Sequence, residues 1–187
     1  ERLGFLGGTA TNSVIGPISP FPFGDEQVIN GIPQNFMDEL MASGGSPGHL
    51  KTLDPYGSGA SLGFYDREKY KYVAQEMMVK AGVDILFHTF VRSVVKSGNT
   101  VTGLVVSSRE KDFTFSCKQV VDCTGDGDVA VKAGEEFVFG DEVTHKAQPG
   151  SSMFEMADVD VEKTYDYIVN NPEDFEFKTD CVPLKPY

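Results

Sequence analysis

Apolar side chains at helical spacing predict a first helix shortly after Gly31. They recur every three or four residues, Pro33 suits the first turn of a helix, and Gly44 and Gly45 end the pattern. The apolar face of this helix consists of Ile32, Phe36, Met37, Leu40 and Met41. The flanking stretches 4–24 and 46–64 are rich in glycine, so we predict loops there, with one helical turn at 9–15.

A second and longer helix is predicted between Asp66 and Gly82. Asp66 is a suitable N-cap, because its side chain can accept a hydrogen bond from the first free amides. Gly82 suits the left-handed residue that commonly ends a helix. The buried stripe of this helix is predicted to consist of Tyr70, Val73, Ala74, Met77, Met78 and Ala81.

The spacing of apolar residues then shifts towards the period of two that is typical of strands. Residues 83–96 are rich in β-forming side chains, and Gly98-Asn99 makes a plausible tight turn. Residues 101–107 return as a strand, and Phe113, Phe115 and Cys117 alternate with polar residues in a third. We therefore predict a three-stranded antiparallel meander over about residues 90–117.

After the meander, a short apolar strand at 120–123 is predicted to run into the turn Thr124-Gly125-Asp126-Gly127. One or two helical turns at 129–133 would follow, closed by Gly134. In the tail we predict a strand at 152–156 and an amphipathic helix after Asp160. The apolar positions of that last helix are Tyr165, Ile168 and Val169.

Composition narrows the class of protein. The chain has 187 residues, enough for one domain or one domain and a small lobe, and its 28 acidic and 16 basic residues give a net charge of −12. This charge opposes binding to nucleic acid and to anionic membrane surfaces. The three cysteines, Cys117, Cys123 and Cys181, show no CxxC spacing, and no apolar run is long enough to span a membrane. We expect a cytoplasmic protein without a metal site.

Two glycine-rich segments could carry chemistry. Gly7-Gly8-Thr9 precedes a predicted helical turn and can present bare backbone N–H groups to an anion, although such a segment is commonly a plain turn. Thr124-Gly125-Asp126-Gly127 lies where a predicted strand end turns into a helix, which is where open α/β sheets bind ligands. The alternative there is a turn that binds nothing.

The order of segments in the chain resembles that of FAD-dependent oxidoreductases of the glutathione-reductase-like flavoprotein superfamily. The resemblance covers about residues 1–156. It rests on the segments ERLGFLGGTAT, VINGIPQNFMDEL, DREKYKYVAQEMMVKAGVDILFHTFV, VVDCTGDGDVAVKAG and QPGSSMF. It implies an α/β protein with a partial FAD-binding fold over residues 1–150, into which the meander is inserted, and the start of a substrate or cap region over 151–187.

The resemblance also implies which residues contact the cofactor FAD. Glu1 matches the acid that holds the adenosine ribose, with Arg2 beside it, and Val91 matches the strand residue whose backbone meets the adenine. Gly7, Gly8 and Thr9 match the loop that runs past the pyrophosphate, and Thr124, Gly125 and Asp126 match a second glycine signature beside the dinucleotide. The implied reaction is hydride or two-electron transfer on a small-molecule substrate. No catalytic residue is indicated.

The family's GxGxxG motif is absent from the sequence. Because that loop neutralises the pyrophosphate, we expect the chain to be an inactive internal fragment that binds FAD weakly or not at all. We also expect it to self-associate, because a sheet that lacks its first two parallel strands exposes an edge. Two alternatives stay open. One is an acidic interaction module without cofactor, and the other is a metal- or phosphate-dependent hydrolase that uses Asp122, Asp126 and Asp128.

Other polar candidates are weaker. The histidines His49, His88 and His145 are widely spaced, and His88 is predicted to lie inside a strand as a structural residue. Asp54, Tyr56 and Arg67 lie in or near a loop that could face a substrate, although Arg67 follows the predicted cap and is better interpreted as a solvated charge at a helix start.

Overall fold

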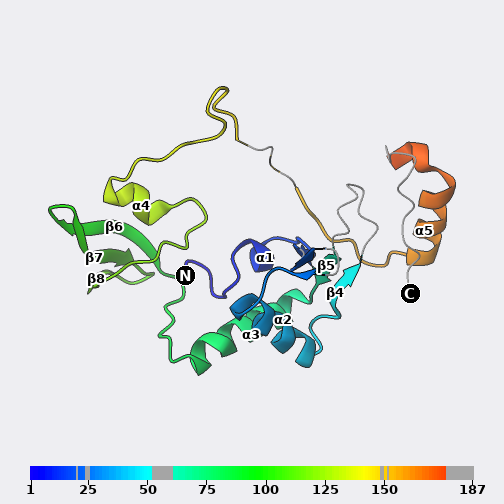
Figure 1. Ribbon diagram of the computed structural model, residues 1–187, viewed down its shortest axis with the longest axis horizontal. Coiled ribbons are helices and arrows are strands. Elements are labelled where there is room, and N and C mark those ends of the chain that lie inside the picture. The colour runs from blue at the N-terminus through cyan, green and yellow to red at the C-terminus, as the bar shows by residue number, and fades with distance from the viewer. Residues whose placement is uncertain (20, 24–25, 52–60, 148–149, 151, 176–187) are drawn as a thin grey trace. The chain divides into compact units, whose positions relative to one another are not determined.

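The computed structural model describes residues 1–19, 21–23, 26–51, 61–147, 150 and 152–175 (Figure 1). The chain divides into two compact units, each made of two segments. Unit 1 comprises Glu1–Gly8 and Met78–Ser152, and unit 2 comprises Thr9–Met77 and Met153–Tyr187. Each unit is described below by itself.

Unit 1 is built around a three-stranded antiparallel sheet, and this confirms the predicted meander. The strands are β6 (Phe90–Ser97), β7 (Thr100–Ser107) and β8 (Asp112–Ser116), in the order β6-β7-β8. The turn between the first two uses Gly98 at a positive φ of 59°. Gly103 in the middle strand is required by packing, since a Cβ there would stand 2.6 Å from the carbonyl oxygen of Phe115.

The helix α4 (Asp128–Ala133) packs against β6. Its side chains Val129 and Ala133 are buried, and the Lys96 ammonium of β6 donates to the carbonyl of Ala133 at the helix end. Gly134 closes the helix in the left-handed conformation, as predicted. The predicted strand at 120–123 is wrong, because this segment takes no strand pairing and Val121 is exposed.

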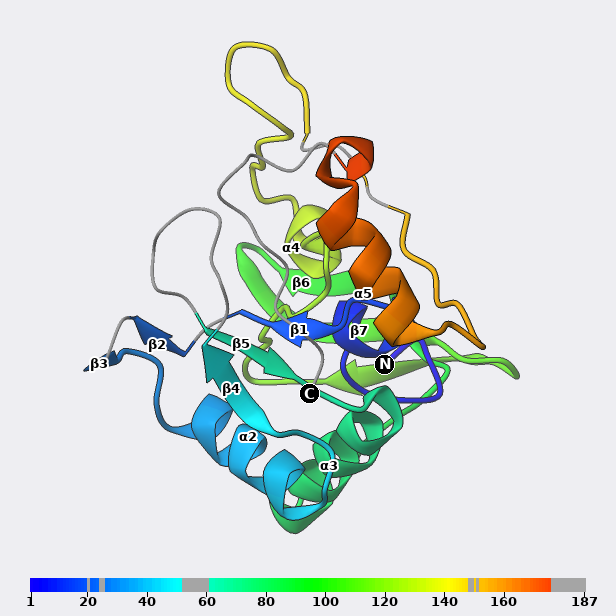
Figure 2. The ribbon, with the colours of Figure 1, turned by 90° about the vertical axis from the view of Figure 1, so that its right-hand side faces the viewer.

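Unit 2 contains the predicted helix α2 (Ile32–Ala42) and, as far as Met77, the predicted helix α3 (Arg67–Lys80). The two helices lie side by side next to the strands β4 and β5 (Figure 2). Met37 and Leu40 of α2 are almost fully buried and form the centre of this core. The N-cap prediction for α3 is confirmed, since Asp66 Oδ1 accepts a hydrogen bond of 2.9 Å from the amide of Lys69.

The stripe predicted for α3 is only partly buried. Val73 is buried and Tyr70, Ala74 and Met77 are half-buried, whereas Met78 and Ala81 are exposed. The predictions for Met78 and Ala81 are therefore wrong, and Ala81 lies beyond the end of α3 at Lys80.

Five short strands of unit 2 were not predicted. They form the sheet β1-β5-β4, from β1 (Pro17–Ile18), β5 (Ser61–Phe64) and β4 (Gly48–Lys51), and the hairpin of β2 (Pro22–Phe23) with β3 (Glu26–Gln27). The loop predictions for 4–24 and 46–64 are therefore wrong at these positions. Two- to four-residue strands rich in glycine and proline carry no periodicity, and they form through pairing between distant segments.

The N-terminal turn and the tail complete the described elements. The helical turn predicted at 9–15 is observed as α1 (Thr9–Asn12). In the tail, the helix predicted after Asp160 is observed as α5 (Val161–Asn170). Asp160 caps this helix through a hydrogen bond of 3.0 Å from the amide of Lys163, and the 3-10 helix η1 (Pro172–Phe175) follows. The strand predicted at 152–156 is wrong, since the described part of this segment takes no regular structure.

The fold is thus a mixture of helices and small sheets, compatible with the α/β class. All strand pairings of the described residues are antiparallel, so the parallel strands of the expected FAD-binding arrangement are not among them. Within the described part of the chain, no helix is both long and apolar enough to span a membrane.

Candidate functional site

The turn before α4 is organised by the carboxylate of Asp122. One carboxylate oxygen, Oδ1, accepts hydrogen bonds from the Thr124 amide at 3.0 Å and the Thr124 hydroxyl at 2.7 Å. The other, Oδ2, accepts from the amides of Val129 at 2.9 Å and Ala130 at 3.0 Å. The Thr124 hydroxyl oxygen in turn accepts from the Asp128 amide at 2.7 Å. Two side chains therefore cap the first three amides of α4.

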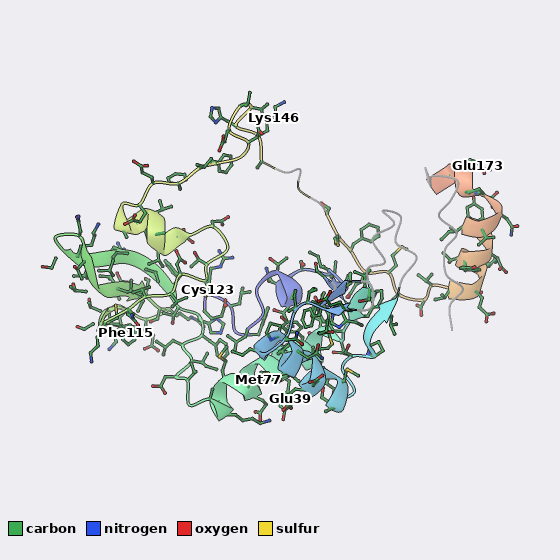
Figure 3. All side chains as sticks on the ribbon, viewed as in Figure 1. Glu39, Met77, Phe115, Cys123, Lys146 and Glu173 are labelled. Atoms are coloured by element: carbon green, nitrogen blue, oxygen red, sulfur yellow. The ribbon has the colours of Figure 1, made fainter. Side chains whose placement is uncertain are left out.

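This network changes the acidity of Asp122. The Ala130 amide, the Thr124 hydroxyl and amide, and the Val129 amide stabilise the charged carboxylate, and they lower its pKa to about 2 from an ordinary 3.8. The same hydrogen bonds tie Asp122 both to Thr124, at the start of the turn, and to the first turn of α4, which follows it. Cys123, labelled in Figure 3, lies inside this loop and is exposed.

The capped amides restrict what the turn can bind. Because Asp122 and Thr124 already occupy the N-terminal donors of α4, these amides are not available to a phosphate group. Asp126 and Asp128 add further negative charge to the same turn. The interpretation of Asp122, Asp126 and Asp128 as metal ligands also finds no support, since no group of three or more potential metal ligands occurs among the described residues.

Gly125 is the position of this turn that stays open. It has no positive φ, and a Cβ built on it would meet no atom within 4 Å. Within the described part of the chain its amide makes no hydrogen bond. Neither backbone conformation nor packing therefore requires glycine here. A glycine of this kind leaves room for a ligand to approach the backbone closely, which fits a flat, extended group such as a dinucleotide.

The Gly7-Gly8 segment belongs to the same unit as this turn. Both residues have positive φ, 113° and 52°, so both need glycine for conformational reasons, and a Cβ on Gly8 would meet nothing within 4 Å. Thr9 begins α1 and falls in unit 2. The other predicted cofactor contacts all lie in unit 1, namely Glu1, Arg2, Gly7, Gly8, Val91, Thr124, Gly125 and Asp126.

Residues 1–3 run beside residues 86–89. The backbone nitrogen of Glu1 donates to the Leu86 carbonyl at 2.8 Å, and the Thr89 amide donates to the Glu1 carbonyl at 2.9 Å. The Glu1 carboxylate is exposed and accepts a hydrogen bond of 2.7 Å from the Leu3 amide through Oε1. Glu1 is thereby attached to the segment that enters β6, where Val91 pairs with Val106.

The remaining candidates are placed as follows. His88 was predicted wrongly to lie in a strand: it precedes β6, is exposed, and has a positive φ of 52°. Arg67 is less solvated than predicted, since its guanidinium lies 3.5 Å from Glu155 and its side chain is 34% exposed. Asp54 and Tyr56 lie outside the described residues. His49, which was given no role from the sequence, lies on β4 with its Nε2 buried.

These observations define a mixed α and β protein with a hydrogen-bonded turn at Thr124–Gly127, in which a Cβ on Gly125 would meet no atom within 4 Å. The family model that matches the chain, over residues 1–183, is described as FAD dependent oxidoreductase. The chain belongs to this family. Membership of this family indicates a flavoprotein with a redox function and FAD as its cofactor. A comparison with curated proteins finds no match.

Proposed function

We propose that this chain contributes part of the FAD site of an oxidoreductase that transfers a hydride or two electrons to or from a small molecule. In flavoproteins the bound isoalloxazine supplies the redox chemistry, while the protein binds and orients it. The proposed FAD-binding domain is the partial glutathione-reductase-like fold of residues 1–150. The proposed substrate or cap region begins at about residue 151.

Gly125 is the observation that carries this proposal. Neither its backbone conformation nor its packing requires a glycine at this position. It lies in a turn that hydrogen bonds to Asp122 hold on both sides. A backbone position without a side chain suits an extended ligand that must approach the protein closely. The family match supports the choice of FAD as the ligand in this proposal.

Each of the other residues is proposed to contact a different part of FAD. Glu1 accepts hydrogen bonds from the adenosine ribose through its exposed carboxylate, with Arg2 beside it, and the Val91 backbone meets the adenine. Gly7 and Gly8 present backbone without side chains to the diphosphate. Because the α4 amides are already capped, Thr124, Gly125 and Asp126 contribute through close backbone approach and not through a helix N-terminus.

The chain on its own is proposed to bind FAD weakly and to be inactive. Neutralising a diphosphate requires several backbone N–H groups or basic side chains, and the sequence has neither a GxGxxG loop nor a positive net charge. A dissociation constant on the order of 1 mM is expected for such partial contacts.

The test measures the affinity for FAD by equilibrium dialysis. It compares the unaltered chain with two variants, in each of which one glycine is replaced by valine. Gly125→Val places a side chain on the open backbone and is expected to weaken FAD binding at least about tenfold, the equivalent of one lost contact of about 1.4 kcal/mol. Gly16→Val is the matched control, because Gly16 also has no positive φ and no atom within 4 Å of a Cβ, but belongs to unit 2. Equal affinity of both variants and the unaltered chain would contradict the proposal.

Neither alternative function is favoured. The family match assigns redox chemistry to the chain, and the Asp122 oxygens are occupied by four hydrogen bonds and are not presented to a metal ion.

A further inference from the structure

Asn30 and Gly31 lie between the strand β3 and the start of α2. Asn30 is the one asparagine of the sequence that a glycine follows, and both residues are exposed. The backbone nitrogen of the next residue can attack an asparagine side chain, and glycine leaves that nitrogen least hindered because it has no Cβ. The pair is therefore a candidate site for a reaction of the chain with itself.

The backbone nitrogen of Gly31 is accessible in the folded chain. Among the described residues its N–H makes no hydrogen bond, and only its carbonyl is engaged, by the amide of Asn35 at 2.9 Å. A Cβ on Gly31 would meet no atom within 4 Å, so no neighbour crowds the residue. Its φ of 70° favours glycine, so the backbone conformation itself requires the residue that makes the pair reactive.

The other asparagines have no such neighbour. The residue after each of them carries a Cβ, and its amide is hydrogen-bonded, lies in a helix or strand, or is missing because the residue is proline. The pairs are Asn12-Ser13, Asn35-Phe36, Asn99-Thr100, Asn170-Asn171 and Asn171-Pro172. Asn99 is the best matched control, because it is also exposed and lies in a turn, but the β-branched Thr100 that follows it begins β7.

The side chain of Asn30 is held only loosely. Its amide nitrogen Nδ2 donates to the Gln27 carbonyl over 3.2 Å, a long hydrogen bond. The carbon Cγ and the Gly31 nitrogen are joined through the backbone of Asn30 itself. Rotation about the bonds of this one residue can therefore bring the two atoms together, and no distant contact of the fold is needed.

We propose that Asn30 and Gly31 form a site of spontaneous deamidation in the folded chain. The Gly31 nitrogen forms a bond to Cγ of Asn30, the bond from Cγ to Nδ2 breaks, and ammonia leaves with the proton that the Gly31 nitrogen loses. Water then opens the resulting succinimide at either of its two carbonyls. One product is aspartate, and the other is isoaspartate, in which the main chain runs through Cγ. Water is the only co-reactant.

The modification changes the charge at the start of α2. Gly31 is the N-cap of this helix and gives it no side-chain hydrogen bond, and the first turn contains no acidic residue. Both products replace a neutral amide by a carboxylate beside this end of the helix. A negative charge is favourable there, because the helix dipole is positive at its N-terminus. Deamidation therefore supplies the charge that the first turn lacks.

The test is incubation of the whole folded chain, followed by mass spectrometry of its peptides with isoaspartate measured at each asparagine. It does not depend on FAD binding. Asn30 is expected to be converted at least about tenfold faster than Asn99, which corresponds to a difference of about 1.4 kcal/mol in the activation barrier. Isoaspartate is expected to accompany aspartate, because opening of the succinimide ring produces both. Asn30→Gln, which would have to close a larger ring, is expected to stop conversion at this position and to leave Asn99 unaffected.

A second incubation in guanidinium chloride measures the rate in the unfolded chain. Because the Gly31 amide is already free in the folded chain, the two rates at Asn30 are expected to agree within about tenfold. A folded rate below this range overturns the proposal, since the fold then protects the site. It is also overturned if Asn30 reacts no faster than Asn99, or if aspartate forms without isoaspartate. These comparisons use the unaltered chain, so they decide the matter without a variant.

Discussion

The acidity of Asp122 gives a direct test of how the Thr124–Gly127 turn is held. With four hydrogen bonds to its carboxylate, its pKa is about 2 in place of 3.8. At pH 3 such a group is roughly 90% ionised, whereas an ordinary aspartate is roughly 14% ionised. Because the folded value is lowered, the stabilising contribution of this cap is complete above pH 3.8 and is lost as the pH falls through about 2.

The assay is a pH titration of the Asp122 carboxyl carbon by NMR, with the amide signals of α4 showing that the helix stays folded. Thr124→Val keeps the shape of the side chain but removes its hydroxyl, so the pKa of Asp122 is expected to rise towards 3.8 without reaching it, since the backbone amides still donate. A midpoint near 3.8 in the unaltered chain would refute the reasoning, because the carboxylate could not then be holding the turn.

Three further outcomes are expected. Gly103→Ala should destabilise the meander by about 1–3 kcal/mol in urea denaturation, because its Cβ would stand 2.6 Å from the Phe115 carbonyl oxygen; an unchanged midpoint would contradict this packing. Leu40→Ala, at a residue with no exposure, should cost about 2–5 kcal/mol by the same measurement, and a loss below 1 kcal/mol would place Leu40 outside the core. Size-exclusion chromatography at high concentration should show species larger than the 20.4 kDa monomer, through unpaired strand edges; a clean monomer would count against this.

The sequence predicted those elements whose signals are local. The helix that Asp66 starts and Gly82 ends was found because a capping side chain and a glycine lie at its two ends. The helix after Asp160 was found because its apolar residues recur at helical spacing. The meander was found because its strands are long enough to show alternation and its first turn contains Gly98. These features depend on contacts between residues close in the chain.

Elements that depend on distant pairing were missed. The strand Gly48–Lys51 pairs with Ser61–Phe64, and both read as glycine-rich loop. The segments 120–123 and 152–156 have β-forming residues, but neither takes strand structure where the chain is described. Propensity alone does not make a strand, because its backbone groups need a neighbouring strand to pair with.

In the candidate sites too, residues with a local signal were predicted, and residues brought together by contacts between distant positions were missed. Gly125 was identified from the sequence, since a glycine signature is local. The role of Asp122 was not, because its carboxylate caps amides seven and eight residues further along the chain. Asn30 and Gly31 are adjacent in the sequence, but only the structure shows that the Gly31 amide has no hydrogen bond among the described residues.

Mapping FAD onto the ¹⁵N-labelled chain by NMR would show whether unit 1 contacts FAD through its glycine backbone. We expect the amide resonances of Gly7, Gly8, Val91, Gly125 and Asp126 to shift together and with one affinity. FAD-dependent shifts that spare Gly8 and Gly125 and gather elsewhere in the chain would contradict this expectation.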